Sequence, residues 1–224
     1  MDLSDLWLTS WVLGRAAPLK VIGPPDTAET SGHLEKAFEC DVQTRGKDEG
    51  FPADGAKLSA RNVQPGVVFE KNGLKVTAFA VDHGGGITPT HGYRADYGGR
   101  SVAFSSDTHY FEPIVEHARG VDVLVHEVIS PELEERRAQV FGTRARERVI
   151  AHHTVPDQTG TIFSRVKPRL AIDSHIVPSP TTAEDLIGPT RKTYAGPLAV
   201  GYDLMTIAIS DTIETYLRKI LGDK

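Results

Sequence analysis

The order of hairpins and strand–helix units along the chain constrains the fold more than any other feature. Hairpins are expected over residues 67–81 and 93–104, because their Asn-Gly and Gly-Gly pairs suit tight turns. Buried strands then alternate with helices. We expect strands at residues 121–125 and 170–172, and helices at residues 131–148 and 157–166. Hairpins followed by this alternation favour a sheet packed on a sheet with helices outside. We therefore expect an α+β sandwich.

The beginning of the sequence is unusually apolar. Leu3, Leu6, Trp7, Trp11 and Val12 fall near helical spacing, as in a helix that packs on a core. Because chain termini are usually polar and frayed, this start is typical of the interior of a domain whose first part is absent.

The remaining segments are weaker in pattern. We expect one domain over residues 1–224, with a polar surface loop at about 46–61 where glycine, proline and charged residues interrupt the chain. The end of the sequence predicts a helix from about Thr212 to Leu221.

The composition excludes several classes of protein. Of the 224 residues, 39% are hydrophobic and 25% are charged, which is ordinary for a soluble fold and argues against a disordered chain. No apolar run approaches the roughly 20 residues that a membrane helix needs. The net charge of −5 gives no global attraction to nucleic acid, although a local basic groove remains open. A single cysteine, Cys40, cannot form an internal disulfide.

Histidines and carboxylates recur where predicted strands end. His83, Asp107, the His126-Glu127 pair and His175 each follow an apolar strand, and the pair His152-His153 precedes a helix. Side chains at strand ends are where such folds assemble their sites. Imidazole with carboxylate is a ligand set for zinc, manganese or iron, and one aspartate can bridge two cations.

Each of these signals also has a plain structural explanation. A lone histidine after a strand is more often a hydrogen-bonded structural residue than a ligand, and Asp107-Thr108 could form a turn or a helix cap. His126 and Glu127 could be a buried pair that orients a loop. Only their succession at strand ends points to a metal site.

The ordered set of motifs resembles the metallo-β-lactamase superfamily, and most closely its ribonuclease Z-like branch. The resemblance covers essentially the whole chain and implies an αββα sandwich. The matching stretches are Asp82-His83-Gly84, Gly92-Tyr93-Arg94, Gly99 to Thr108, Asp122 to Glu127, His153-Thr154, Ser174-His175-Ile176 and Gly201 to Met205.

The resemblance implies a role for each site residue. His83 would bind a first metal, His175 a second, and Asp107 would bridge the two, so that two divalent ions are expected, zinc before manganese or iron. Glu127, after His126, would orient a catalytic histidine, which we expect to be His153, with His152 one position earlier as the alternative.

One departure from the family pattern stands out. The signature His-x-His-x-Asp-His, which supplies most ligands of the first metal, does not occur in the sequence. The chain therefore resembles a family member that is incomplete at its N-terminus, and we expect weak metal binding and little turnover from this chain alone.

The resemblance implies a metal-dependent hydrolase, of the phosphodiesterase or ribonuclease Z-like kind, in which metal-activated hydroxide attacks phosphorus. The substrate would be a small ester or a phosphodiester, with RNA as one candidate, and a homodimer is a further expectation. Hydrolysis of other esters, lactones or sulfate esters is an alternative, as are a non-catalytic remnant and a structural domain whose histidines all lie in the core. No membrane association is expected, and the compartment stays open, with the cytoplasm as the default.

Overall fold

The computed structural model describes residues 2–141, 143–177 and 181–217, and its contacts divide the chain into two compact units, residues 1–64 and 65–224. Among the described residues, no helix combines the length and the apolar character that crossing a bilayer requires.

The first unit contains three helices and one short sheet. Its elements are α1 (Leu3–Val12), β1 (Leu19–Gly23), α2 (Thr27–Ala37), α3 (Glu39–Asp48), a 3₁₀ turn (Ala53–Ala56) and β2 (Leu58–Asn62). The apolar start is the helix that was expected, because Trp7 and Trp11 are buried and their indole N–H groups donate to the carbonyls of Ala56 and Pro52.

The segment expected to be a loop at 46–61 is more ordered than its composition indicates. It contains the end of α3, the 3₁₀ turn and most of β2, which pairs in parallel with β1 from Leu19↔Leu58 to Gly23↔Asn62. The surface-loop prediction is therefore wrong there. A parallel partner almost 40 residues upstream stabilises a strand that has no local pattern of its own.

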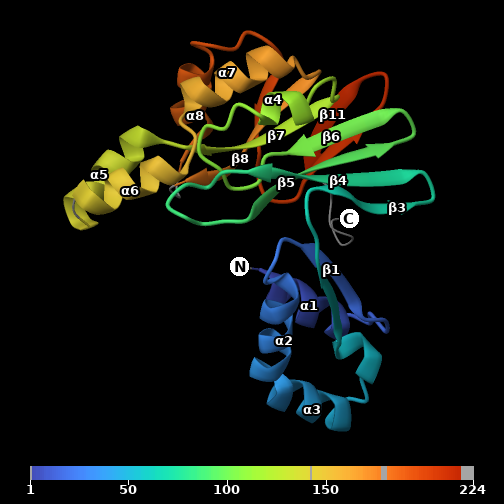
Figure 1. The fold of residues 1–224 in the computed structure, drawn as a ribbon. Coiled ribbons are helices and arrows are strands. Elements are labelled where there is room, and N and C mark those ends of the chain that lie inside the picture. Colours follow the sequence, from blue (N-terminus) through green and yellow to red (C-terminus); the bar gives the residue numbers. More distant parts are fainter. Residues whose placement is uncertain (1, 142, 178–180, 218–224) are drawn as a thin grey trace, which may run out of the picture. The chain divides into compact units, whose positions relative to one another are not determined.

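The second unit is built on a seven-stranded mixed sheet in the order β3-β4-β5-β6-β7-β8-β9 (Figure 1). Both expected hairpins are confirmed, and β6, β7 and β8 are parallel to one another. The strands are β3 (Gly66–Lys71), β4 (Leu74–Val81), β5 (Thr90–Tyr97), β6 (Arg100–Phe104), β7 (Val123–Ile129), β8 (Leu170–Val177) and β9 (Leu198–Val200).

Helices cover one face of this sheet (Figure 1). They are α4 (Ile114–His117), α7 (Pro156–Val166) and α8 (Ala183–Thr190), whereas α5 (Pro131–Phe141) and α6 (Thr143–His152) pair with each other as a separate hairpin. The core between helices and sheet is apolar and contains Phe79, Ala103, Leu124, Ile162 and Phe163. The charged helix expected over 131–148 is thus two helices.

A two-stranded ribbon of β10 (Met205–Ile209) and β11 (Ile213–Leu217) completes the second unit. Ile207 of β10 shares a groove with Phe104, Val125 and Ile172 of the large sheet. The helix expected from about Thr212 is wrong as far as Leu217, because this segment pairs with β10, and its remainder lies outside the described residues. The α+β class is confirmed.

Candidate metal centre

The carboxyl ends of the parallel strands bring the candidate residues together. Asp107 lies in the loop after β6, Glu127 near the end of β7, and His175 near the end of β8, while His153 follows α6 and His83 follows β4. Because β6, β7 and β8 run in the same direction, the loops that follow them meet at one edge of the sheet.

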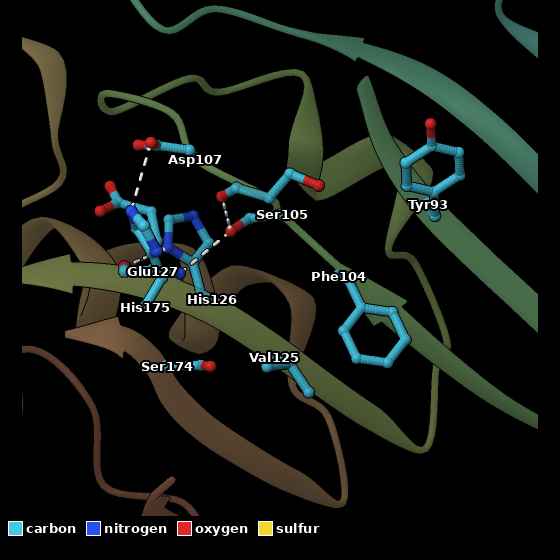
Figure 2. A pocket seen from close by; sticks show the side chains of 10 residues that line it. Tyr93, Phe104, Ser105, Asp107, Val125, His126, Glu127, Ser174 and His175 are labelled. Atoms are coloured by element: carbon cyan, nitrogen blue, oxygen red, sulfur yellow. Dashed lines mark hydrogen bonds and ion pairs between the residues drawn. The ribbon is translucent and has the colours of Figure 1, made fainter. Parts of the chain in front are cut away.

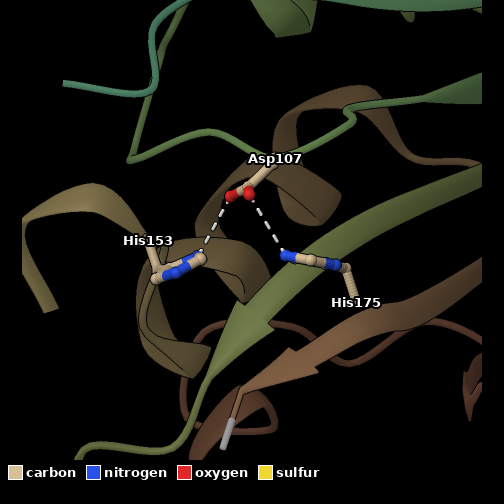
Figure 3. Close-up of side chains that lie close together, drawn as sticks. All are labelled: Asp107, His153 and His175. Carbon is tan, nitrogen blue, oxygen red and sulfur yellow. Dashed lines mark ion pairs between the residues drawn. The ribbon is translucent and has the colours of Figure 1, made fainter. Parts of the chain in front are cut away.

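Asp107 is the centre of the cluster, and Figure 3 shows His153 and His175 on either side of it. Its Oδ1 lies 3.1 Å from Nδ1 of His83 and 3.1 Å from Nδ1 of His153, and its Oδ2 lies 3.2 Å from Nε2 of His175. One ligand atom from each of Asp107, His153 and His175 lies within 4.8 Å of the other two. Four of the side chains that the sequence singled out therefore lie together here.

The cluster has the ligand atoms that a divalent cation needs, and one of its oxygens lacks a hydrogen-bond partner among the described residues. Oδ1 of Asp107 is buried, yet it has no hydrogen bond of normal geometry within the described part of the chain. A carboxylate surrounded by imidazoles is one of the ligand sets that bind zinc in proteins. These residues therefore fit a divalent metal, and Asp107 is the side chain with two separately directed oxygens.

The charges in the cluster support one another. Burial would raise the pKa of Asp107, but the close contacts of its two oxygens with His153 and His175 outweigh burial and hold that pKa well below its usual range. In return, the hydrogen bond to Asp107 raises the pKa of His175. The carboxylate is therefore ionised at every pH at which the protein would be studied.

Glu127 holds His153 in place. It is almost fully buried, and one oxygen accepts from Nδ1 of His153 at 3.0 Å while the other accepts from the backbone N–H of Thr154. Burial opposes a charged imidazole, yet the nearby carboxylate of Asp107 and the hydrogen bond to Glu127 raise the pKa of His153 to about 9. With Nδ1 engaged by carboxylates, Nε2 is the ring nitrogen of His153 that is left for chemistry.

Two neighbouring serines shape the loop that presents Asp107. The buried hydroxyl of Ser105 donates to the carbonyl of Ser106 at 2.7 Å and accepts from the backbone N–H of Glu127 at 3.0 Å. Ser106 has a φ of 58°, a left-handed conformation that is rare outside glycine. Neither serine was assigned a role from the sequence, because a serine pair in a loop carries no signal of its own.

His126 and His152, for which the sequence left more than one role open, lie in different settings. His126 is fully buried, packs edge-on to Phe163, and burial lowers its pKa to about 4. Its Nδ1 bonds to the carbonyl of Glu127, which suits a structural residue. His152 lies against His83 and is outside the group of three ligand atoms.

A pocket of about 340 Å³ opens beside the cluster (Figure 2). Tyr93 and Phe104 lie at one end of it, whereas Asp107 and His175 lie at the other. A second groove of about 400 Å³ also includes Phe104 and His175 in its lining. A small substrate could therefore reach the cluster from a partly aromatic surface.

Comparison with known protein families decides the family. The model described as the beta-lactamase superfamily domain matches residues 13–176. The chain belongs to the metallo-β-lactamase superfamily. This membership confirms the predicted sandwich fold and hydrolase class, and together with the cluster around Asp107 it supports the use of divalent metal.

Curated relatives of this superfamily member are ribonucleases Z. A protein of Mycobacterium tuberculosis named putative ribonuclease Z is 28% identical over 213 residues, covering 93% of each chain. A ribonuclease Z of Mycobacterium bovis is also 28% identical, and the match covers 93% of this chain and 74% of that one. The resemblance to the ribonuclease Z-like branch is confirmed.

Solved structures of the superfamily share the fold. The metallo-beta-lactamase fold protein YhfI from Bacillus subtilis has a TM-score of 0.58 at 14% identity, covering 89% of this chain and 69% of that one. The human short-form tRNase Z has a TM-score of 0.57 at 14% identity, covering 93% and 73%. Zinc-bound PqqB from Methylobacterium extorquens has a TM-score of 0.52 at 14% identity, covering 85% and 65%.

Proposed function

We propose that this superfamily member is a metal-dependent phosphodiesterase of the ribonuclease Z-like kind. The single observation that carries the proposal is the placement of Asp107 between three imidazoles at the carboxyl ends of the parallel strands. The names of the relatives support a phosphodiester substrate. The RNA substrate that we propose is a tRNA precursor, cleaved near its 3′ end, in line with the name of the human tRNase Z.

In this proposal His83, Asp107 and His175 would hold two divalent ions, for which zinc is the expected metal and manganese or iron the alternatives. Asp107 would serve both ions, since its Oδ1 faces His83 and His153 while its Oδ2 faces His175. Bound cations would supply Lewis acidity, which polarises a phosphoryl oxygen and strengthens water as a nucleophile.

His153 is the proposed general acid. Glu127 accepts its Nδ1–H at 3.0 Å and so fixes the orientation of the ring. The pKa of about 9 keeps a second proton on Nε2 at neutral pH. That proton is available for the leaving oxygen of a diester, which is how a positioned imidazolium assists hydrolysis.

The number of ligands limits the expected activity. Three proposed ligand residues serve two ions, and the sequence contains no His-x-His-x-Asp-His motif that would add more. We therefore expect metal affinity below that of a complete dinuclear site, and slow turnover. This absence is also the specific observation in favour of the second candidate, a non-catalytic member of the superfamily.

The test is metal content together with hydrolysis of bis(p-nitrophenyl) phosphate in added zinc or manganese. Asp107→Asn should abolish both metal retention and turnover, because it removes the bridging charge. Asp96→Asn is the matched control, since Asp96 pairs with Arg94 and lies outside the cluster. Wild-type protein that retains no metal and cleaves no diester would favour the non-catalytic candidate.

A further inference from the structure

His83 and His152 are joined by a reciprocal pair of hydrogen bonds. Nδ1 of His83 donates to the carbonyl of His152 at 3.0 Å, and Nδ1 of His152 donates to the carbonyl of His83 at 2.7 Å. The two residues are 69 positions apart, and their ring centroids lie 5.4 Å apart. Each histidine therefore uses its ring to hold the backbone of the other.

The chain next to His83 is built to accept the ring of His152. Gly84, Gly85 and Gly86 have φ values of 72°, 57° and 80°, a left-handed run that glycine adopts without strain. A Cβ on Gly85 would lie 2.3 Å from Cε1 of His152, so a side chain there would displace the ring. The loop after β4 thus approaches the end of α6 as closely as its backbone allows.

The pair also determines which nitrogen of His83 carries the proton. Nδ1 of His83 lies 3.1 Å from Oδ1 of Asp107, but only the carbonyl of His152 accepts from it with hydrogen-bond geometry. Nδ1 is therefore the protonated nitrogen, and the lone pair of the ring is on Nε2. A histidine ligand that donates its other N–H to a carbonyl has a fixed tautomer and orientation.

We propose that His152 is a positioning residue, which fixes His83 in the tautomer whose Nε2 can bind a metal, and that it is neither a ligand nor the general acid. The inference rests on the proposed function only for the role of His83 as a ligand. The His152 side chain acts indirectly: by holding the carbonyl of His83, it keeps its own carbonyl in place to accept Nδ1–H of His83.

Two amide substitutions separate this role from the alternatives. In His152→Asn the amide nitrogen can take the place of Nδ1 and still donate to the carbonyl of His83. In His152→Gln the amide reaches the position of Nε2 and loses that bond. His152→Ala loses both the bond and the contact with Gly85, while exposed His33, mutated to alanine, controls for the loss of any imidazole.

The first measurement is zinc affinity by competition with a chromogenic chelator. We expect His152→Asn and His33→Ala to match the wild type, and His152→Gln and His152→Ala to bind zinc about 10- to 100-fold more weakly. Equal weakening in all three variants of His152 would mean that its imidazole is itself a ligand. Unchanged affinity in all three would also overturn the proposal.

The second measurement needs neither metal nor turnover. Long-range ¹H–¹⁵N NMR of metal-free protein reports the tautomer of His83, with His83→Asn used to assign its signals. Nδ1 should carry the proton in wild type and in His152→Asn, and the other tautomer should gain population in His152→Gln. If this pattern holds while wild-type protein binds no zinc, the proposed function fails and the positioning role stands. Identical tautomers in all variants would overturn it.

Discussion

Glu127 and Asp173 are buried carboxylates on neighbouring parallel strands, and their surroundings differ sharply. Glu127 on β7 is 2% exposed and accepts hydrogen bonds from His153 and from the backbone of Thr154. Asp173 on β8 is fully buried, faces the helices as Ala171 does, and neither of its oxygens has a hydrogen bond within the described residues.

The difference shows what a buried charge requires in this fold. Burial raises the pKa of both carboxyls. Around Glu127, His153 and Thr154 act in the opposite direction and offset part of the burial penalty, whereas around Asp173 only Thr190 opposes burial, and the pKa of Asp173 rises to about 7. A buried carboxylate is therefore stabilised more by its neighbours at the site edge of the sheet, around Glu127, than in the layer between sheet and helices, around Asp173.

The largest effect is expected from Glu127→Leu, which removes the partner of two buried groups. The Nδ1–H of His153 and the N–H of Thr154 would lose their acceptor, and breaking a buried pair from one side typically costs about 4 kcal/mol. Urea denaturation of the metal-free protein measures this loss. Glu127→Gln keeps the shape and part of the hydrogen bonding, so its loss should be about half. A neutral result for both variants would contradict the supporting role given to Glu127.

The opposite sign is expected from Asp173→Asn. Its folded pKa of about 7 lies above the unfolded value near 3.8, so the carboxyl costs stability increasingly as the pH rises through that window. At pH 8 the variant should therefore be more stable by roughly 2 kcal/mol. At pH 3.5 most of the gain should vanish, because the carboxyl is then protonated in the folded state and mostly protonated in the unfolded state. Thermal denaturation at the two pH values measures the difference in stability between the variant and the wild type. Destabilisation of the variant at pH 8 would show that the Asp173 carboxylate makes a stabilising interaction, and would contradict the prediction.

The smallest effect is expected at Ser106, in the loop that is bonded to the backbone around Glu127. Ser106, whose carbonyl accepts from the serine that also binds the backbone of Glu127, has a φ of 58°. Ser106→Gly should increase the free energy of unfolding by about 1 kcal/mol, since glycine adopts this conformation without strain. Ser106→Ala is the control, with no gain expected. Equal stability of the two variants would mean that the loop carries no strain at Ser106.

Local signals in the sequence were sufficient for part of the fold. The turns at Asn72-Gly73 and Gly98-Gly99 were correctly identified because short-range backbone preferences decide a hairpin. β2 and β11 were missed because each depends on a partner strand rather than on its own pattern. Ile213 to Leu217 contains isoleucine, threonine and tyrosine, which favour strands. The segment was nevertheless predicted to be part of a helix at the end of the chain.

The same division applies to the candidate site. Asp107 and His175 could be predicted because they lie at the ends of parallel strands whose direction fixes where they meet, whereas His153, which follows α6, was assigned through the resemblance to the family. The bonds between His83 and His152 could not, since they depend on where α6 ends relative to a loop 69 residues away. Asp173 carried no signal either, because an acidic residue in an apolar strand gives no indication of which face it occupies.

The parallel order of β6, β7 and β8 has a consequence for how the protein is made. Its cluster draws on residues from His83 to His175, so no stretch of nascent chain shorter than about 90 residues contains all of its members. Parallel strands close long loops before they gain contacts, which makes their pairing slow. During synthesis the imidazoles would emerge from the ribosome one after another. Metal binding would come last, because it requires His175 and therefore the pairing of β8 with the sheet.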